Sequence, residues 1–201
     1  MSPGLKIRAA RAEDAAFVAL LIYLSMDSLA DHLFNQEPGS MQALLEKLVA
    51  RNAGRFGYKH AFVAEVDGQK AGLLVAVQGV DLNRLALATI PHLIAVLGLT
   101  RAIGIIWRTV KLPGEREAEN DELYISNIGV LPSMQGQSLG SQLLAYAEGL
   151  ALEHRLMKCS LIVGWHNTDA RRLYERVGYR VVETVKDEKE DHGYYRMVKA
   201  L

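Results

Sequence analysis

The hydrophobic positions along this chain predict short strands that alternate with amphipathic helices. Leu5 to Ala9 alternates between apolar and polar side chains, which is typical of a short strand. From Ala15 to Leu24 the apolar residues recur at helical spacing. A second helix fits Ser40 to Val49, with Pro38-Gly39 as a break before it and Ser40 as its candidate N-cap.

A hairpin in the first half of the chain predicts the centre of a sheet. Its arms, His60 to Val66 and Lys70 to Gln78, are rich in Ala, Val and Leu, and Asp67-Gly68 between them favours a tight turn. Three more strands are predicted toward the C-terminus: Lys158 to Val163, Tyr179 to Val185 and Tyr194 to Val198.

A strand, a loop of small residues and a helix follow one another in the middle of the chain. Leu123 to Val130 is a β-rich run, Pro132 begins a turn, and apolar residues from Leu139 onward line one helical face. The free N–H groups and the dipole at a helix start favour phosphate, and glycine lets an anion approach the backbone. An ordinary strand-to-helix turn is the alternative. The loop has no Lys, which excludes a Walker loop, and no acidic residue ends the next strand, as a dinucleotide fingerprint requires.

The stretch 81–120 is the unusual part of the chain. Leu85 to Thr100 contains no charged residue, but Pro91 interrupts it, and the run is shorter than the roughly 20 apolar residues of a membrane span. We predict one or two helices that are buried or face a partner and end at Leu112-Pro113-Gly114. A lid, core or homodimer element and a membrane-surface contact are the alternatives. We expect Glu115 to Glu122 to form a solvated acidic loop.

Composition narrows the class of protein. A chain of 201 residues, half of them apolar, fits one domain spanning 1–201. Its 23 basic and 23 acidic residues balance, which argues against nucleic acid as the main partner. Cys159, the single cysteine, excludes an internal disulfide, and we expect it to fill core space rather than act as a nucleophile. Met1 to Arg11 lacks the apolar region of a signal peptide, so we expect a cytoplasmic protein.

Two motifs resemble those of the GNAT acetyltransferase superfamily. Gln135-Gly136-Gln137-Ser138-Leu139-Gly140 is similar to the acyl-CoA pyrophosphate loop Gln/Arg-x-x-Gly-x-Gly/Ala, with Ser138 where glycine is usual. Asn167 to Tyr179 matches Asn-x-x-Ala-x-x-x-Tyr-x-x-x-Gly-Tyr/Phe without a departure. The two motifs lie about 30 residues apart in the family's order. The ending Gly193 to Lys199 also resembles the family's last strand.

The resemblance implies a mixed α/β (α+β) GNAT fold, with a twisted sheet of about seven strands flanked by helices. The stretch 81–120 would be a helical insertion between the third and fourth strands. The sheet would be splayed between Leu123–Val130 and Lys158–Val163, so that the pantetheine of acetyl-CoA enters like an extra strand. Ser25 to Glu37, with Met26 among its apolar residues, would form part of the acceptor wall or only cover the sheet.

The same resemblance implies which residues bind acetyl-CoA. Backbone N–H groups from Gly136 onward would hold the pyrophosphate, and Ile128, Gly129 and Val130 would offer main-chain groups to the pantetheine. The pyrophosphate loop comprises Gln135, Gly136, Gln137, Ser138, Leu139, Gly140 and Ser141. Asn167 and Ala170 would face the pantetheine arm. Asn167 is also a candidate N-cap for the helix that follows, and the two roles are compatible.

Acetyl transfer to an amine needs a base for the amine proton and an acid for the leaving thiolate. Tyr174 matches the family tyrosine whose hydroxyl points at the CoA sulfur, and the alternative is that it only packs. Glu122 stands where some members of the superfamily carry a general-base glutamate. A solvated carboxylate, with ordered water as the base, is the alternative. No metal site is expected, because the histidines are scattered without ligand spacing.

We therefore expect a CoA-dependent N-acyltransferase with acetyl-CoA as cosubstrate. It would move the acetyl group to a primary amine, on a small molecule or a peptide, by direct transfer in a ternary complex. Two other functions stay open: a GNAT-fold protein that binds acyl-CoA without turnover, and an acyltransferase that works at a membrane surface. The sequence does not identify the acceptor.

Overall fold

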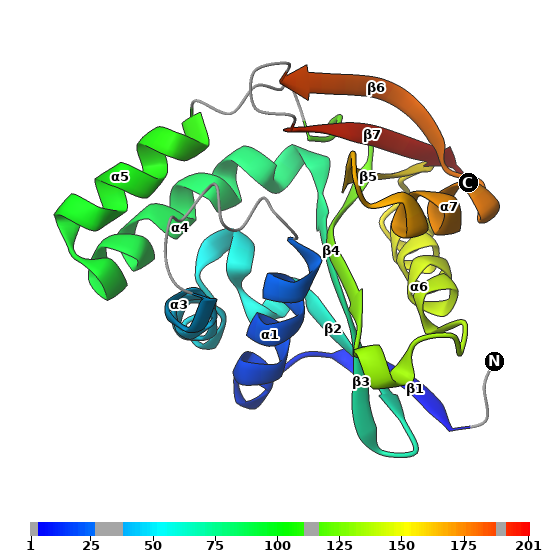
Figure 1. Ribbon diagram of the computed structural model, residues 1–201, viewed down its shortest axis with the longest axis horizontal. Helices are drawn as coiled ribbons and strands as arrows, with labels where there is room; N and C mark the ends of the chain where they lie inside the picture. The colour runs from blue at the N-terminus through cyan, green and yellow to red at the C-terminus, as the bar shows by residue number, and fades with distance from the viewer. Residues whose placement is uncertain (1–3, 27–37, 111–116, 188–191) are drawn as a thin grey trace.

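The computed structural model describes residues 4–26, 38–110, 117–187 and 192–201, and these build one mixed sheet of seven strands (Figure 1). The strand order is β1-β2-β3-β4-β5-β7-β6, and neighbours are antiparallel except for β4 and β5. The strands are β1 (Leu5–Ala9), β2 (Ala61–Val66), β3 (Gln69–Gln78), β4 (Leu123–Val130), β5 (Lys158–Gly164), β6 (Arg180–Asp187) and β7 (His192–Ala200).

Helices cover both faces of this sheet, which confirms the predicted fold class. On one side lie α1 (Ala15–Ser25), α3 (Pro38–Ala50), α4 (Leu82–Leu97) and α5 (Leu99–Val110), and on the other lie α6 (Leu139–Glu153) and α7 (Thr168–Arg176) (Figure 1). Short 3-10 turns are η1 (Ala12–Asp14), η2 (Gly54–Phe56), η3 (Tyr58–His60), η4 (Gly79–Asp81) and η5 (Pro132–Met134).

Strand β3 separates two hydrophobic cores, as its apolar composition predicted. Leu73 packs with α1 and α3, whereas its neighbour Leu74 packs with α6 on the other face, because successive side chains of a strand point to opposite sides. The predicted turn into β3 is also present. Asp67 and Gly68 both have positive φ, 50° and 79°, as a two-residue hairpin turn of type I′ requires.

Two of the predicted helix signals were wrong. Helix α3 begins at Pro38, so Pro38-Gly39 does not precede the helix and Ser40 is not its N-cap. Proline suits a first helical turn, since its fixed φ is helical and its missing N–H has no partner there. Helix α4 runs without interruption through Pro91. The carbonyl that loses its partner belongs to Leu87, which is exposed, so water can replace that hydrogen bond.

The predicted insertion forms a helical hairpin, α4 and α5, between β3 and β4. Its inner face is buried against the core of α1 and α3, through Leu93, Ala102 and Ile105. Its outer face exposes large apolar side chains: Leu87, Leu99, Ile103 and Trp107. The core role is therefore confirmed for one face, and a lid or dimer contact for the other stays a prediction. The predicted end at 112–114 lies outside the described residues.

By length and composition alone, one helix in the described part of the chain would suffice to cross a membrane. It is the 19-residue stretch Gly79–Leu97, in which η4 leads directly into α4. This stretch differs from the uncharged run Leu85 to Thr100, because it begins earlier in the chain and includes Asp81 and Arg84. A single such helix remains weak evidence, because the core helices of soluble proteins pass the same test.

The hairpin offers a matched pair of isoleucines for testing its inner face. Ile105 is 5% exposed and Ile103, two residues earlier on α5, is 45% exposed. Ile105→Ala should lower the free energy of unfolding by about 2–4 kcal/mol, because it leaves a cavity in the core. Ile103→Ala should lower it by less than about 1 kcal/mol. Urea denaturation of both variants measures the difference, and equal losses would contradict the assigned orientation of α5.

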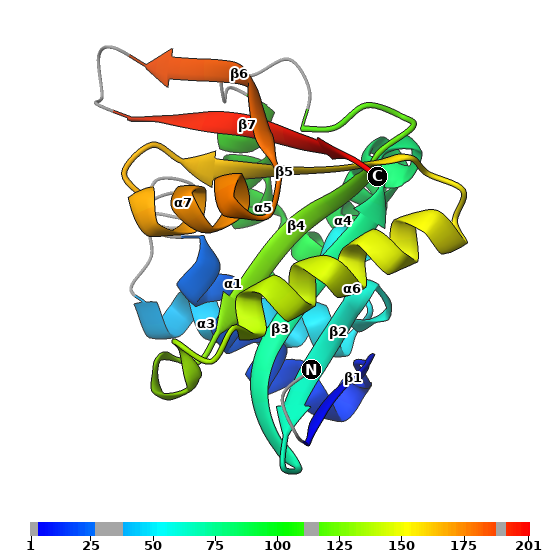
Figure 2. The ribbon, with the colours of Figure 1, turned by 90° about the vertical axis from the view of Figure 1, so that its right-hand side faces the viewer.

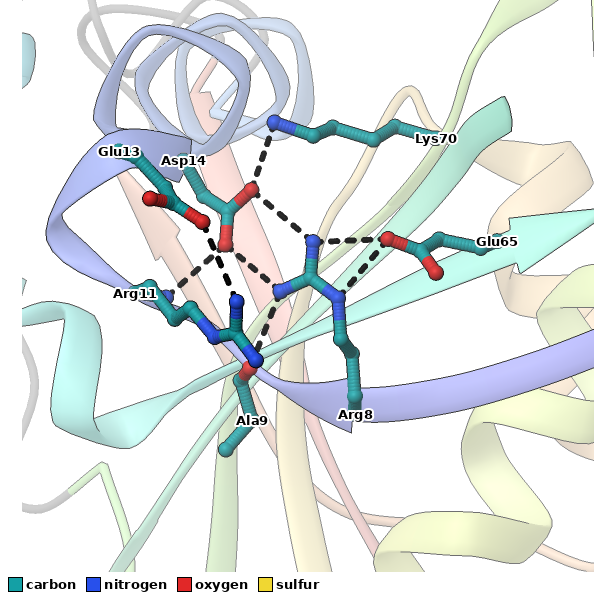
Figure 3. Close-up of polar contacts among 7 residues, drawn as sticks. All are labelled: Arg8, Ala9, Arg11, Glu13, Asp14, Glu65 and Lys70. Carbon is teal, nitrogen blue, oxygen red and sulfur yellow. Dashed lines mark hydrogen bonds and ion pairs between the residues drawn. The ribbon is translucent and has the colours of Figure 1, made fainter. Parts of the chain in front are cut away.

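A buried carboxylate ties the first three strands together (Figure 3). The side chain of Asp14 in η1 is fully enclosed. It accepts two hydrogen bonds from Arg8 of β1, at 2.7 and 3.1 Å, and lies 2.6 Å from Lys70 Nζ of β3. It also accepts the backbone N–H of Arg11 at 2.9 Å. Arg8 in turn donates to Glu65 of β2 at 2.8 Å. These contacts fix the point where β1 leads into α1.

The Asp14 cluster predicts an acid-sensitive contribution to stability. The hydrogen bonds from Arg8 hold the pKa of Asp14 well below its usual value. Asp14→Asn should lower the free energy of unfolding by about 1–3 kcal/mol at pH 7, because Arg8 and Lys70 lose the carboxylate that they share. The stabilisation is complete above the unfolded pKa of about 3.9 and is lost as the pH falls toward the folded value. The gap between the wild-type chain and the variant should therefore narrow only below about pH 4.

Glu13→Gln is the control for Asp14→Asn. Its side chain is 70% exposed and contacts Arg11 at 3.3 Å, so it should change the free energy of unfolding by less than about 0.5 kcal/mol. A difference between wild type and Asp14→Asn that stays constant from pH 7 to pH 2 would contradict the assignment.

Candidate functional site

The centre of the sheet opens between β4 and β5, as the splayed arrangement predicted. The two strands pair at only three positions, from Leu123 opposite Cys159 to Ile125 opposite Leu161. Beyond Ile125, β4 continues along β3 and β5 continues along β7, so their facing edges separate. Figure 2 shows the two strands together at one end and apart at the other.

A β-bulge in β4 marks the start of this opening. Val75 of β3 pairs with Asn127 and Ala76 pairs with Ile125, so Ser126 is an extra residue in β4. A bulge bends its strand and increases the local twist, which turns the rest of β4 away from β5. The bulge therefore accounts for the position at which the two strands part.

Past the bulge, alternate main-chain groups of β4 face the opening. The Leu131 N–H bonds to the Ala71 carbonyl of β3 at 2.9 Å. By the alternation of a ladder, the groups of Gly129 also face β3, and those of Ile128 and Val130 point toward the opening. The Val130 carbonyl accepts a long contact of 3.4 Å from Gln135 Nε2. Ile128 and Val130 thus present main-chain groups to the opening, and their contact with pantetheine stays a prediction, whereas the main chain of Gly129 is used within the sheet.

The loop after β4 is exposed and ends at the start of α6. Residues 135–138 are all exposed, and within the described residues no acceptor is recorded for the backbone N–H groups of residues 136–141. Gly136 adopts φ 78°, and a Cβ built on it would meet no atom within 4 Å. Its conformation rather than crowding therefore calls for glycine. The free N–H groups and the positive end of the helix dipole together can hold an anion.

Ser138 adopts the left-handed conformation that its position in the loop demands. Its φ and ψ are 59° and 14°, and its side chain makes no capping hydrogen bond to α6. A residue with a Cβ pays a conformational cost there that glycine avoids. The backbone at Ser138 therefore has the left-handed conformation that glycine adopts most easily, although the residue is a serine.

Gly140 allows α6 and α7 to approach each other. A Cβ at Gly140 would lie 3.0 Å from Leu173 Cδ2 of α7. This glycine therefore has a packing role next to the loop, in addition to the anion contact predicted from the sequence. A substitution at Gly140 would disturb both roles at once and cannot separate them.

Asn167 caps α7, which confirms one of its two predicted roles. Its Oδ1 accepts the backbone N–H of Ala170 at 3.2 Å. Asn167 follows β5 directly, on the side where β5 has left β4. The contact of Asn167 and Ala170 with pantetheine stays a prediction.

Helix α7 also carries Tyr174 on its inner face. Tyr174 is 7% exposed and lies in the core shared with α6, with its ring 6.2 Å from that of Tyr179. Burial raises the pKa of Tyr174 to about 12. The phenol therefore keeps its proton at neutral pH and can donate a hydrogen bond. Both packing and donation are compatible with this position.

The sequence predicted that Glu122 belongs to a solvated acidic loop, and this prediction was wrong. Its side chain is 3% exposed and pairs with Arg196 Nη2 of β7 at 2.5 Å. It also accepts the Glu119 N–H at 2.9 Å. Moreover, it precedes Leu123 at the closed end of the β4–β5 pair, about 10 Å of strand from the opening. This geometry gives Glu122 a structural role and does not favour it as the base.

Two further predictions concern chemistry outside the opening. Cys159 is fully buried in β5, and burial raises its pKa to about 12, so it fills core space as expected. Among the described residues, no three His, Cys, Asp or Glu side chains are grouped as a metal site requires.

A profile of the Acetyltransferase (GNAT) family matches residues 26–179. The match covers most of the chain and includes the exposed loop, the opening and α7 with Tyr174.

The chain belongs to this family.

Individual relatives agree with the family match. The uncharacterized N-acetyltransferase YycN of Bacillus subtilis (strain 168) is 30% identical over 87 residues, 43% of this chain and 53% of that protein. The aminoalkylphosphonate N-acetyltransferase of Salmonella typhimurium is 39% identical over 77 residues, 38% of this chain and 43% of that protein. The chain thus spans about half the length of these relatives. The crystal structure of an N-acetyltransferase from Staphylococcus aureus Mu50 has a TM-score of 0.72 and 26% identity, and the match covers 96% of this chain and 99% of that one.

One polar cluster of this GNAT chain was missed by sequence reasoning. Arg55 of η2 donates to Glu117 Oε2 at 2.6 Å, contacts Ser126 Oγ at 3.4 Å and lies over the ring of Tyr124, 5.6 Å from its centroid. Asn127 extends the cluster, since it donates to Ser25 Oγ of α1 at 2.9 Å. Glu117 appeared in the sequence only as one of several acids. No local pattern indicated that Arg55, 62 residues earlier, would reach it.

The strained loop residue of this GNAT chain predicts a contrast between two substitutions. Ser138→Gly removes the cost of positive φ and should keep or raise both stability and the affinity for CoA. Ser138→Val places a β-branched residue at φ 59° and should weaken CoA binding about tenfold, for roughly 1–2 kcal/mol of added strain. Calorimetric titration with CoA measures both. Equal affinity in the two variants would show that the loop does not hold this conformation when CoA binds.

Proposed function

We propose that this chain transfers the acetyl group of acetyl-CoA to a primary amine, by direct transfer in a ternary complex. One observation carries the proposal: a loop of unbonded backbone N–H groups adjoins the opening between β4 and β5, and Tyr174 lies on the helix that follows β5. Membership of the GNAT family supports this reaction class. The reaction would run in the cytoplasm, where the buried thiol of Cys159 stays reduced.

The loop and β4 together suit the shape of acetyl-CoA. The pyrophosphate would accept hydrogen bonds from the N–H groups of residues 136–141 at the start of α6. The pantetheine would run from there along β4 and pair with the outward main-chain groups of Ile128 and Val130, as an added strand does. The thioester would then lie near Ser126, where β4 and β5 part.

Tyr174 would assist the departing thiolate. The amine nitrogen attacks the thioester carbon, the C–N bond forms, and the C–S bond breaks. Negative charge then develops on sulfur. A phenol with a pKa of about 12 remains protonated and can donate a hydrogen bond to that charge. The interaction exists only as the reaction proceeds, so it accelerates the chemistry without tightening the binding of acetyl-CoA.

The acceptor would be a small amine or a peptide amine. The similarity to an aminoalkylphosphonate N-acetyltransferase over 38% of the chain supports the inclusion of aminophosphonates among the amines to test. A chain that binds acyl-CoA without turnover is the competing function. Measured release of free thiol distinguishes the two, because a binding protein alone releases none.

The test is a thiol-release assay with acetyl-CoA and a panel of amines: butylamine, spermidine, lysine, 2-aminoethylphosphonate and a peptide with a free N-terminus. We expect turnover of at least one amine by the wild-type chain. Tyr174→Phe keeps the ring and its packing, so the rise in melting temperature with acetyl-CoA should persist. Turnover should fall by roughly 10²- to 10⁴-fold.

Tyr179→Phe is the control for Tyr174→Phe. It removes the hydroxyl of a neighbouring buried tyrosine that packs against Tyr174, and it should keep full turnover. Full activity of Tyr174→Phe would reduce Tyr174 to a packing residue. No turnover by the wild-type chain, despite a melting-temperature shift with acetyl-CoA, would favour the binding protein.

A further inference from the structure

The two faces of the sheet offer different chemistry to the opening between β4 and β5. Tyr174 belongs to the core of α6 and α7 on one face. The cluster of Arg55, Glu117 and Ser126 lies on the other face, since Asn127 next to it bonds to α1 and Tyr124 packs with Leu82 and Leu85 of α4. A thioester in the opening would therefore have Tyr174 on one side and this cluster on the other.

Glu117 is the carboxylate of this cluster, and it is accessible. Its side chain is 40% exposed, and the bond from Arg55 is made to Oε2. Arg55 also contacts Ser126, the first residue of β4 beyond the last β4–β5 pair. A single guanidinium thus separates the Glu117 carboxylate from the point where the sheet opens.

Glu122 provides the contrast that decides between the two acids. It is enclosed, it is paired with Arg196, and it stands at the closed end of the strand pair. Glu117 is accessible: its backbone carbonyl also accepts a hydrogen bond from Arg196, at 3.3 Å, but its side chain turns to Arg55, which contacts Ser126 at the opening. Arg55 holds Glu117 by a short ion pair, and the neighbouring ring of Tyr124 and Ser126 Oγ hold Arg55 in turn. The carboxylate is therefore fixed in position and can still meet a cation from solvent.

We propose that Glu117 attracts the ammonium group of the acceptor and accepts its proton through one water, because Arg55 lies between the carboxylate and Ser126, and that Arg55 positions Glu117 for this step. The proposal rests on the acetyl transfer proposed above. It assigns the acceptor side of the site to the face of the sheet covered by α1 and α4. The acceptor it selects is one that arrives as a cation, that is, a primary alkylammonium.

The proton balance of this step is complete. An ammonium gives up two N–H protons as it becomes an amide. The first passes to Glu117 and frees the nitrogen lone pair, which attacks the thioester carbon. The second leaves the nitrogen as the C–S bond breaks and ends on the thiolate, which departs as free CoA thiol. Glu117 then returns its proton to solvent through its exposed side.

Glu117→Gln tests this with the amine that the wild-type chain acetylates fastest in the panel above. At pH 7 the variant should lose about 10²-fold or more in kcat/KM for the amine, the usual effect of a missing base. The melting-temperature shift with acetyl-CoA should be unchanged. The loss should shrink about tenfold per pH unit as the pH rises toward the pKa of the amine, since more of the acceptor is then already neutral. A purely structural role would give a loss that does not depend on pH.

Three further variants complete the experiment. Asp121→Asn removes an exposed carboxylate of the same segment, paired with Lys158 at 2.9 Å, and should keep wild-type kinetics. Arg55→Lys keeps the charge but cannot contact Glu117 and Ser126 at once, as the two guanidinium nitrogens do. Its kcat/KM for the amine should fall, but by less than that of Glu117→Gln. Glu122→Gln should lower the melting temperature and leave the pH profile of kcat/KM unchanged.

The outcomes separate this inference from the proposed function. Wild-type kinetics and pH profile in Glu117→Gln would overturn the role of Glu117 and leave the acetyl transfer intact. A pH-dependent loss in Glu122→Gln instead would reassign the base to Glu122. Absence of turnover by the wild-type chain with every amine would overturn the proposed function itself.

Discussion

The short pairing between β4 and β5 is the constraint on which the site depends. Three paired residues hold the two strands together, and the bulge at Ser126 ends the contact. The position at which the β4–β5 pairing ends determines the layout of the site. Among the described residues, no strand pairs with the main-chain groups of Ile128 and Val130 that face the opening. The loop after β4 leads into α6, and α7 follows β5 on its far side. A sheet that paired fully at this point would have no room for a ligand.

Ion pairs between distant segments keep this partly paired sheet in shape. Arg196 of β7 reaches across β5 to Glu122, and so secures the end of β4 that must stay closed. At the other edge of the sheet, Asp14 joins η1 to β1 and β3. Removal of one partner of such a buried pair costs far more than a surface ion pair contributes. Both carboxylates therefore have structural roles, although one of them stands at a sequence position that suggested catalysis.

The parts of the fold that depend on local patterns could be predicted from the sequence. Strand β4, the Asp67-Gly68 hairpin turn and the helix after the loop are all specified by residues close to one another in the chain. Predictions failed where partners are distant or where tertiary context decides. The burial of Glu122 depends on Arg196, 74 residues away, and the pairing of Glu117 depends on Arg55. Helix α4 tolerates Pro91 because the carbonyl that loses its hydrogen bond belongs to Leu87, which is exposed to solvent.

The proposed site separates the groups assigned to the donor from those assigned to the acceptor. The loop, α6 and α7 lie in one continuous stretch of chain after β4, and they carry the two family motifs. The cluster on the other face is built from η2 and from the segment before β4, and both lie beside the α4–α5 hairpin. A change in the hairpin would therefore alter the proposed acceptor face without touching the loop after β4 or Tyr174. The opening lies between β4 and β5 and is reached from both faces of the sheet. In the proposed reaction the thioester from one face and the amine from the other would meet only near Ser126.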